Sequence, residues 1–429
     1  MMSSAGLRAV HVEDKVATVS PHRMRILLHD NSGHPFQVQL ARELARRGHH
    51  VRHLFSAVFQ TPHGALERQA GDPDGFEVAA IDPGEPFAKY SYIKRFRQER
   101  RYGQLLQREL ASFRPDVALM SNTPPDSLVA PQRWCRAQGV GFVFWVQDIY
   151  AEAVARILGQ KLGPLGAPVA WHYRRLEGGL LRRSDQVVPI TDDFKPLLRS
   201  WGIADARITT IENWSPLDEL PLRTKDNAFA RQHGLHDKTV LLYSGTLGLK
   251  HNPGLLLAIA QAHRDDPSVA VVVVSEGLGA SWLAGRKAEH RLDNLHLLPF
   301  QPFDRLPEVL GAADVLLAIL EPEAGIYSVP SKVLTYLCAG KPLLVAMPRE
   351  NLAARTIAQQ EAGVVVAPDD LTGFVAAART LIADPAERAR LGGNARAYAE
   401  RTFDVQRIGA RFETILAQAR SHPDVAHNP

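Results

Sequence analysis

The residues best suited to chemistry stand near the middle of the sequence, where an apolar run ends in a glycine-rich loop. Residues 241–244 have the pattern of a buried strand, and Gly245, Thr246 and Gly248 follow it before Lys250. Glycine lets the main chain approach phosphate oxygens, a helix start presents free N–H groups, and lysine adds a full positive charge. The segment therefore predicts a diphosphate site. The alternative is a plain strand–turn–helix connection with a solvated lysine.

Two helix starts are expected near this loop. Asn252 and Pro253 have the residue types of an N-cap and a first helical turn, so a helix should begin just after Lys250. Ser331 should cap a second helix, which would let both the amide and the ammonium group of Lys332 reach a phosphate. A purely structural role is the alternative for Lys332.

Three later apolar runs end in polar loops of a similar kind. The run at 269–274 reads as a strand buried on both faces of a parallel sheet, and the runs at 295–298 and 315–320 read as further strands. In such a sheet, loops at the carboxyl ends of strands meet at one edge, so all four loops should face the same ligand. The candidate donor-binding residues in them are Gly245, Thr246, Glu276, Gly277, Gln301, Glu323, Ser331, Lys332 and Thr335.

The first half of the chain also alternates strands and helices, which predicts a doubly wound α/β domain. Strands are expected at residues 25–28, 51–55, 117–120, 142–146, 186–190 and 208–211. Gly33 lies in the loop after the first of these and should let the main chain approach donor phosphate or acceptor, with a simple turn glycine as the alternative. Asp148 follows the fourth and is the candidate for orienting an acceptor hydroxyl, with a helix cap as the alternative.

At these residues the sequence resembles the retaining, GT-B-fold glycosyltransferases of glycosyltransferase family 4, also called group 1. The likeness is strongest to the bacterial branch that builds surface polysaccharides, including fucosamine and colanic acid transferases. It extends from about Met24 to about Leu416. The motifs that carry it, in chain order, are residues 145–148, 211–214, 243–247 with Lys250, 306–310, 312–315, 329–333 and 339–342.

The resemblance implies two Rossmann-like domains that face each other across a cleft. Residues 23–215 would bind the acceptor, and residues 216–400 would bind a nucleotide-sugar. Residues 401–429 would form a helix that crosses back to the first domain and a frayed tail, and residues 1–22 are expected to be a disordered extension. A polar, proline-bearing linker is expected around residues 213–227.

The activity that the resemblance implies is transfer of a sugar from a UDP- or GDP-sugar to a lipid-linked or saccharide acceptor. This would serve the biosynthesis of a cell-surface polysaccharide such as a lipopolysaccharide or exopolysaccharide. The anomeric configuration would be retained, with the departing phosphate thought to deprotonate the acceptor, and neither a metal nor a cofactor is expected. A nucleotide-sugar epimerase of the same fold and a non-catalytic nucleotide-sugar-binding protein are the alternatives.

Two departures from the family pattern concern the donor site. The family usually places two glutamates around the helix that opens this site; Glu323 can stand for the first, and Thr335 occupies the second position. The family also often pairs an arginine with the loop lysine, where this chain has Thr246. The resemblance therefore assigns the main catalytic charge to Lys250, helped by Lys332 and by helix amides, because charge develops on the departing diphosphate.

Composition limits the class of protein and its compartment. The 429 residues suffice for two domains, and contents of 45% hydrophobic and 22% charged residues are typical of soluble globular proteins. Cys135 and Cys338 are the two cysteines, which excludes a disulfide framework and fits a reducing cytoplasm. No apolar run is long enough to cross a membrane. We expect a cytoplasmic protein, either free or peripheral on the inner face of the cell membrane.

The net charge of +4 comes from local clusters of basic residues. Residues 89–114 hold eight basic residues against two acids, with aromatic residues between them, and residues 171–183 repeat this pattern. Such surfaces bind anionic bilayers or an acceptor's phosphates, and a solvated basic face is the alternative. Nucleic acid is not an expected partner, because no recognised nucleic-acid-binding module occurs. The basic residues of the first cluster are Lys89, Lys94, Arg95, Arg97, Arg100, Arg101, Arg108 and Arg114.

Two short motifs resemble known binding sequences, but the residues around them do not support a binding site. Asp72-Pro73-Asp74 resembles a metal-binding D-x-D sequence, but a Pro-Asp-Gly run reads as a turn, so no metal site is expected. Gly277 begins a G-x-G sequence that resembles a dinucleotide fingerprint, but Trp282 stands where the third glycine is required.

Overall fold

The computed structural model describes residues 23–58, 65–88, 91–248, 251–320, 322, 325–326 and 329–420. Lys250 and Glu323, both expected at the donor site, lie outside the described residues. The same holds for the expected extension at residues 1–22 and for the tail from residue 421 onward.

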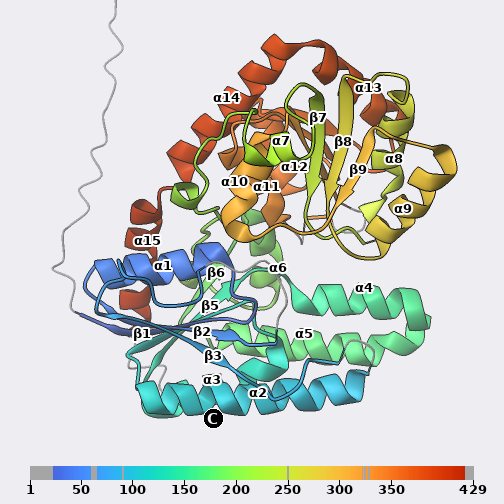
Figure 1. The fold of residues 1–429 in the computed structure, drawn as a ribbon. Helices are drawn as coiled ribbons and strands as arrows, with labels where there is room; N and C mark the ends of the chain where they lie inside the picture. The colour runs from blue at the N-terminus through green and yellow to red at the C-terminus, as the bar shows by residue number, and fades with distance from the viewer. Residues whose placement is uncertain are drawn as a thin grey trace, which may run out of the picture.

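The first domain is a parallel six-stranded sheet with helices on both faces (Figure 1). The strand order is β3-β2-β1-β4-β5-β6, so the direction of winding reverses between β1 and β4. Its strands are β1 (Arg25–Asp30), β2 (His50–Ser56), β3 (Phe76–Ile81), β4 (Val117–Ser121), β5 (Gly141–Val146) and β6 (Gln186–Pro189). Its helices are α1 (Pro35–Arg46), α2 (Tyr92–Phe113), α3 (Pro125–Gln138), α4 (Tyr150–Leu162), α5 (Ala167–Arg182) and α6 (Lys195–Ser200).

The second domain repeats this plan, with the strand order β12-β11-β10-β7-β8-β9. Its strands are β7 (Thr239–Ser244), β8 (Val269–Val274), β9 (Leu295–Leu298), β10 (Val315–Ile319), β11 (Leu343–Ala346) and β12 (Gly363–Val366). Its helices are α7 (Ala228–Gln232), α8 (Gly254–Ala262), α9 (Leu278–His290), α10 (Leu306–Gly311), α11 (Ser331–Cys338), α12 (Leu352–Gln359), α13 (Leu371–Ala383) and α14 (Pro385–Thr402). The expected pair of doubly wound α/β domains is therefore confirmed.

The strands predicted from continuous apolar runs are present because both faces of each parallel sheet are covered by helices. All six side chains of β8 are buried, for example. Two parts of the first sheet differ from expectation. The edge strand β3 was not predicted, since its central residues are partly exposed and alternate weakly. Residues 208–211 are not a regular strand: Thr209 and Ile211 donate main-chain hydrogen bonds to β6, and the chain then leaves the sheet as the linker.

The last helix, α15 (Val405–Arg420), packs against α1 and against β4, β5 and β6 of the first domain. Glu413 on α15 pairs with Arg47 at 2.6 Å and lies 2.9 Å from the ring of His49. Phe412, on the same helix, contacts Trp145 of β5. The end of the chain is thus fastened to the first domain by both polar and aromatic contacts.

The linker between the domains is anchored at Trp214. Its indole stacks on Trp145 and contacts Phe36, and its N–H donates to Gln39 at 2.7 Å. A fully buried indole needs such a partner for its N–H group. Among the described residues, no helix combines the length and the apolar character that crossing a bilayer requires.

Candidate active site

The glycine-rich loop after β7 lies at the point where the second sheet reverses its winding, between β7 and β10. Ligands of open α/β sheets bind at the carboxyl ends of strands at such a point. Gly245 has a φ of +130°, a backbone conformation that side chains disfavour. Its N–H donates to the carbonyl of Val274 at 3.1 Å. The loop is therefore tied to the end of the neighbouring strand, β8.

Lys332, from α11 on the other side of the reversal, lies directly against this loop. Its amine donates to the hydroxyl of Tyr243 at 2.5 Å and lies 3.9 Å from the centre of the same ring. A Cβ atom added to Gly245 would lie 3.1 Å from the amine nitrogen. The structure thus brings together Gly245 and Lys332, which are 87 positions apart in the sequence.

In the part of the chain that the structure describes, the surroundings of the Lys332 amine are short of negative charge. Burial lowers its pKa to about 7, and among the described residues no carboxylate forms an ion pair with it. A buried ammonium group is costly unless an anion accompanies it. Since no anion accompanies the amine among the described side chains, a negatively charged ligand would suit this place beside the glycine loop.

Two tyrosines hold the loop and the lysine in place. The hydroxyl of Tyr336 on α11 donates to the carbonyl of Ser244 at 2.9 Å and accepts from its N–H at 2.8 Å. The hydroxyl of Tyr243 donates to the carbonyl of Thr246 at 2.9 Å. Sequence reasoning did not assign either tyrosine to the site. Their pattern is that of apolar core positions, and their hydroxyl partners depend on a contact between distant segments.

The loop after β8 is joined to the Gly245 loop by main-chain hydrogen bonds. Leu247 donates to the carbonyl of Glu276 at 3.4 Å, and Gly279 donates to the carbonyl of Leu247 at 2.9 Å. Gly277 has a φ of +111°, which glycine adopts without strain. The side chains of Glu276 and Thr246 are both exposed to solvent. Glu276, Gly277 and Thr246 therefore lie at one connected rim, available to a ligand.

The remaining predicted donor residues lie at different depths. The hydroxyl oxygen of Thr335 lies 3.1 Å from the hydroxyl oxygen of Ser215 in the linker, so Thr335 faces the boundary between the domains. Gln301, after β9, donates to the carbonyl of Pro299 at 3.0 Å on the surface. Ser331 is exposed.

Two helix starts differ from expectation by one or two residues. Ser331 is the first residue of α11, and Pro330 takes the N-cap position instead. Asn252 has a φ of +42° and makes no capping bond to α8, whose N-cap is Pro253. In both cases an adjacent proline, whose fixed φ suits a helix start, takes the cap position itself.

A cavity of about 210 Å³ opens in the first domain at the carboxyl ends of β1, β4 and β5. Asp148 lines it, together with Asn31 and Asn122. The walls of the cavity desolvate the carboxyl group and raise the pKa of Asp148, although its side chain keeps access to solvent; the charge of His34 opposes this rise. Carboxylate and amide groups in a concave site can bind hydroxyl groups of a sugar.

His34 lies between two carboxylates at the start of α1. Its ring is 3.1 Å from the buried carboxylate of Asp30, and Asp148 is close enough to act on its charge. Burial alone would lower the pKa of His34, but Asp30 and Asp148 outweigh it and hold this pKa above its usual value. Gly33, just before it, has a φ of +70° and donates to the carbonyl of Asp30 at 3.3 Å. Gly33 therefore shapes the turn that positions this histidine.

Glu177 is a residue at the cavity that the sequence pattern did not indicate. It is buried on α5 and accepts hydrogen bonds from the N–H groups of Tyr150 at 3.1 Å and Ala151 at 2.7 Å. Burial raises the pKa of Glu177 to about 7. This carboxyl group fixes the first turn of α4, which begins two residues after Asp148. Glu177 therefore helps to position Asp148, although it lies on a different helix, α5.

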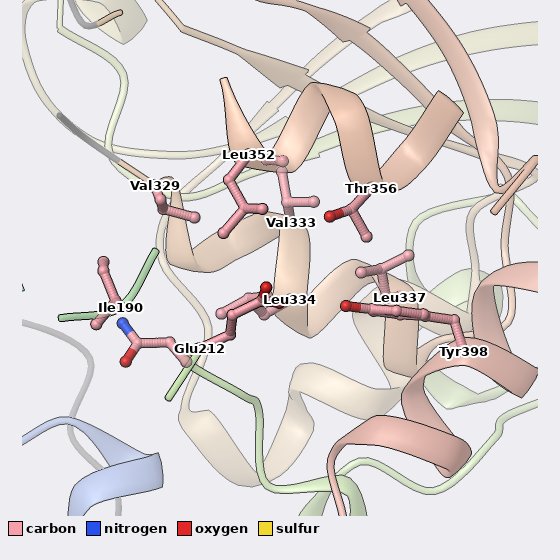
Figure 2. Close-up of a pocket in the computed structure, with 11 residues that line it drawn as sticks. Ile190, Glu212, Val329, Val333, Leu334, Leu337, Leu352, Thr356 and Tyr398 are labelled. Atoms are coloured by element: carbon pink, nitrogen blue, oxygen red, sulfur yellow. The ribbon is translucent and has the colours of Figure 1, made fainter. Parts of the chain in front are cut away.

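Figure 2 shows a small pocket at the boundary between the domains. Leu334 and Leu337 of α11 contribute to its wall, with Ile190 and Glu212 from the first domain's side and Tyr398 from α14. Its volume of about 20 Å³ leaves room for about one water molecule. The helix that carries Lys332 therefore also packs at the boundary between the domains.

Two family models match consecutive parts of this chain. The one described as "Glycosyl transferase 4-like domain" matches residues 34–214, and the one described as "Glycosyl transferases group 1" matches residues 225–398. This protein is a group 1 glycosyltransferase. The two matches divide the glycosyltransferase between its two sheets, with the Asp148 cavity in the first part and Lys332 in the second.

Individual relatives agree with this assignment. WcaI of Escherichia coli strain K12, named as a colanic acid biosynthesis glycosyl transferase, is 26% identical over 317 residues, covering 71% of this glycosyltransferase and 76% of WcaI. Sucrose-phosphate synthase from Thermosynechococcus elongatus superposes with a TM-score of 0.69 at 17% identity, over 92% of this chain and 99% of that one. Anabaena HepE, solved in complex with UDP-glucose, has a TM-score of 0.66 at 17% identity, over 92% of this chain and 100% of HepE. The GT-B fold is thereby confirmed.

Proposed function

We propose that this glycosyltransferase moves a sugar from a UDP- or GDP-sugar to a lipid-linked or saccharide acceptor. The observation that carries the proposal is the buried Lys332 amine, which lies beside the Gly245 loop with no carboxylate partner among the described residues. The diphosphate of the donor would supply the missing negative charge. HepE, whose fold this chain shares, was solved with UDP-glucose, which supports a donor of this class.

In the proposed reaction, the bond between the anomeric carbon and the diphosphate breaks, and negative charge develops on the leaving oxygen. Lys332 would stabilise that charge. Lys250, placed by the sequence between the loop and α8, would share this role. The acceptor hydroxyl would bind in the Asp148 cavity and lose its proton to the departing phosphate, on the same face as the leaving group. This gives retention of configuration, and we propose that no metal or cofactor takes part.

We further propose that the product is a cell-surface polysaccharide. The likeness to WcaI, which is named for colanic acid biosynthesis, supports this process. Thr335, in the position of the family's second glutamate, would meet the nucleotide ribose or the sugar through a hydroxyl group. Glu276, Gly277, Gln301 and Glu323 would complete the donor site.

A thermal-shift panel of nucleotides and nucleotide-sugars tests the donor assignment. A ligand that binds only the folded protein raises its melting temperature, and the rise grows with the logarithm of its concentration relative to its Kd. We expect UDP or GDP, and the matching nucleotide-sugars, to raise the melting temperature, and adenosine diphosphate to raise it less. No rise with any of the uridine or guanosine compounds would contradict the proposal. Transfer of labelled sugar to a lipid extract would then separate the transferase from an epimerase, which needs no acceptor.

Substitution of Gly245 by alanine should weaken binding of that nucleotide about tenfold, because the new Cβ would crowd the Lys332 amine at 3.1 Å and strain a backbone with a φ of +130°. Gly48→Ala is a matched control. Its φ of +96° also lies outside the left-handed region that alanine tolerates, but no atom lies within 4 Å of the added Cβ. Calorimetric titration of both variants should show weaker binding for Gly245→Ala alone. Equal affinities in the two variants would contradict a role for the loop in phosphate binding.

A further inference from the structure

The α4–α5 hairpin projects beyond the rest of the first domain (Figure 1). It presents apolar side chains to solvent. Leu165, in the turn between the helices, is 81% exposed, and Trp171 on α5 is 59% exposed. Ile157, Leu162 and Val169 are also exposed. We call these five residues the tip patch.

The tip patch is not needed to close the hairpin itself. Leu158 and Ala170 are buried between the helices. Gly166 in the turn packs so closely that an added Cβ would lie 2.8 Å from the Cβ of Leu158. The two helices are therefore joined by these inner contacts, whereas the leucines of the turn face outward. Large apolar side chains gathered at one exposed place mark a surface that meets an apolar partner.

The outer part of the hairpin carries an excess of positive charge. Residues 153–176 contain Arg156, Lys161, Arg174 and Arg175 and no aspartate or glutamate, although Arg174 pairs with Glu152 near the start of α4 at 2.8 Å. Arg175 lies over the ring of Trp171 at 4.8 Å, so a cation and an indole lie together at the side of the tip patch. Tryptophan and basic residues around an apolar centre are the composition of surfaces that lie in the headgroup region of anionic membranes.

The start of α2 adds to this surface near the acceptor cavity. Ile93 is 70% exposed and Phe96 is 36% exposed, with basic residues between and beside them. Arg95 of α2 and Tyr150 of α4 both line the cavity that holds Asp148. The first turns of α2 and α4 therefore border the cavity, and the tip patch lies at the far end of α4.

We propose that the tip patch inserts into the headgroup region of an anionic lipid bilayer. The excess of positive charge near the tip patch favours a lipid surface with negative charge over a second copy of this chain, whose identical patch would repel it. This inference goes beyond the donor chemistry. Insertion of the tip patch does not require the proposed function. If both hold, insertion would place the acceptor cavity beside the membrane, where a lipid-linked acceptor resides.

Co-sedimentation of the full chain with vesicles tests this proposal. The vesicles are pure phosphatidylcholine, or phosphatidylcholine with about a third phosphatidylglycerol. We expect binding to the anionic vesicles, weaker binding to the neutral ones, and a decrease as salt is raised, because salt screens the surface charge. The double variant Leu162→Ser with Leu165→Ser should lower the partition coefficient by more than about tenfold, since two leucines lose their apolar contact.

Leu222→Ser with Leu371→Ser is the matched control, since these leucines of the second domain are 54% and 46% exposed. This control should bind vesicles as the unsubstituted protein does. Equal losses in both double variants, or no binding to anionic vesicles, would overturn the proposal. A dimer in solution that the hairpin variant separates, without vesicle binding, would overturn it by assigning the patch to a second copy. Nucleotide thermal shifts, measured on the same proteins, should stay unchanged, so that a failure here is distinct from a failure of the donor assignment.

Discussion

Substitution of Lys332 by methionine is expected to lower kcat/KM for the nucleotide-sugar by about 10²- to 10³-fold, the usual effect of removing one charged donor from a developing anion. Methionine keeps most of the volume of the side chain and removes the amine. Because burial already lowers the pKa of this amine to about 7, its loss should not destabilise the fold. The melting temperature without ligand should stay equal or rise, whereas the rise caused by nucleotide should shrink. Steady-state kinetics and thermal unfolding measure these effects.

Lys238→Met is the control for that variant. Lys238 precedes β7, at the opposite end of the strand from the loop, and its amine donates to the carbonyl of Pro267 at 2.6 Å. It should keep the kinetics of the unsubstituted enzyme. If Lys332→Met retained full kcat/KM, the buried amine would have no part in the reaction. Lys250→Met belongs in the same experiment, because the sequence assigns the main catalytic charge to that position.

Substitution of Asp148 by asparagine should lower kcat by about 10²-fold, the low end of the effect of a group that acts on a reacting hydroxyl, because Asp148 would orient this hydroxyl and the departing phosphate would take its proton. Nucleotide affinity should not change, because Asp148 lines the cavity of the first domain and the donor loops belong to the second. A lower kcat with unchanged nucleotide affinity would indicate a role at the acceptor, because a general loss of folding would lower both. Asp205→Asn, on the surface of the same domain and 66% exposed, is the control and should match the unsubstituted enzyme.

The pH dependence of Asp148 follows from its environment. Desolvation raises the pKa of its carboxyl group above the ordinary 3.8, and the charge of His34 limits this rise. The reactive form is the carboxylate, so activity should fall as the pH drops through the raised pKa, and this acid limb should be absent from Asp148→Asn. An Asp148→Asn enzyme with unchanged kcat, or one that loses nucleotide binding to the same degree, would contradict an acceptor role.

Much of the fold could be predicted because parallel strands that are buried on both faces have continuous apolar sequences. The run 269–274 and β8 coincide, for instance. The edge strand β3 was not predicted, because a partly exposed edge strand does not need a continuous apolar run. Helix starts were misplaced at Asn252 and Ser331, because the neighbouring prolines compete for the cap position.

The site was predictable in its loops and less so in its contacts. The glycines of the first loop and the lysine of α11 were recognisable by residue type, but their approach depends on β7 and β10 being neighbours in the sheet. The roles of Tyr243, Tyr336 and Glu177 depend wholly on such tertiary contacts. No local pattern marks a tyrosine that supports a loop or a carboxyl group that holds the start of another helix.

Proton uptake on nucleotide binding tests the central claim most directly. An amine with a pKa of about 7 is mostly neutral at pH 8, and a diphosphate bound against it must raise that pKa. Calorimetric titration at pH 8, in buffers of different ionisation enthalpy, should therefore show uptake of about one proton per nucleotide, and none in Lys332→Met. Binding without proton uptake, or the same uptake in both proteins, would show that the phosphates do not meet this amine.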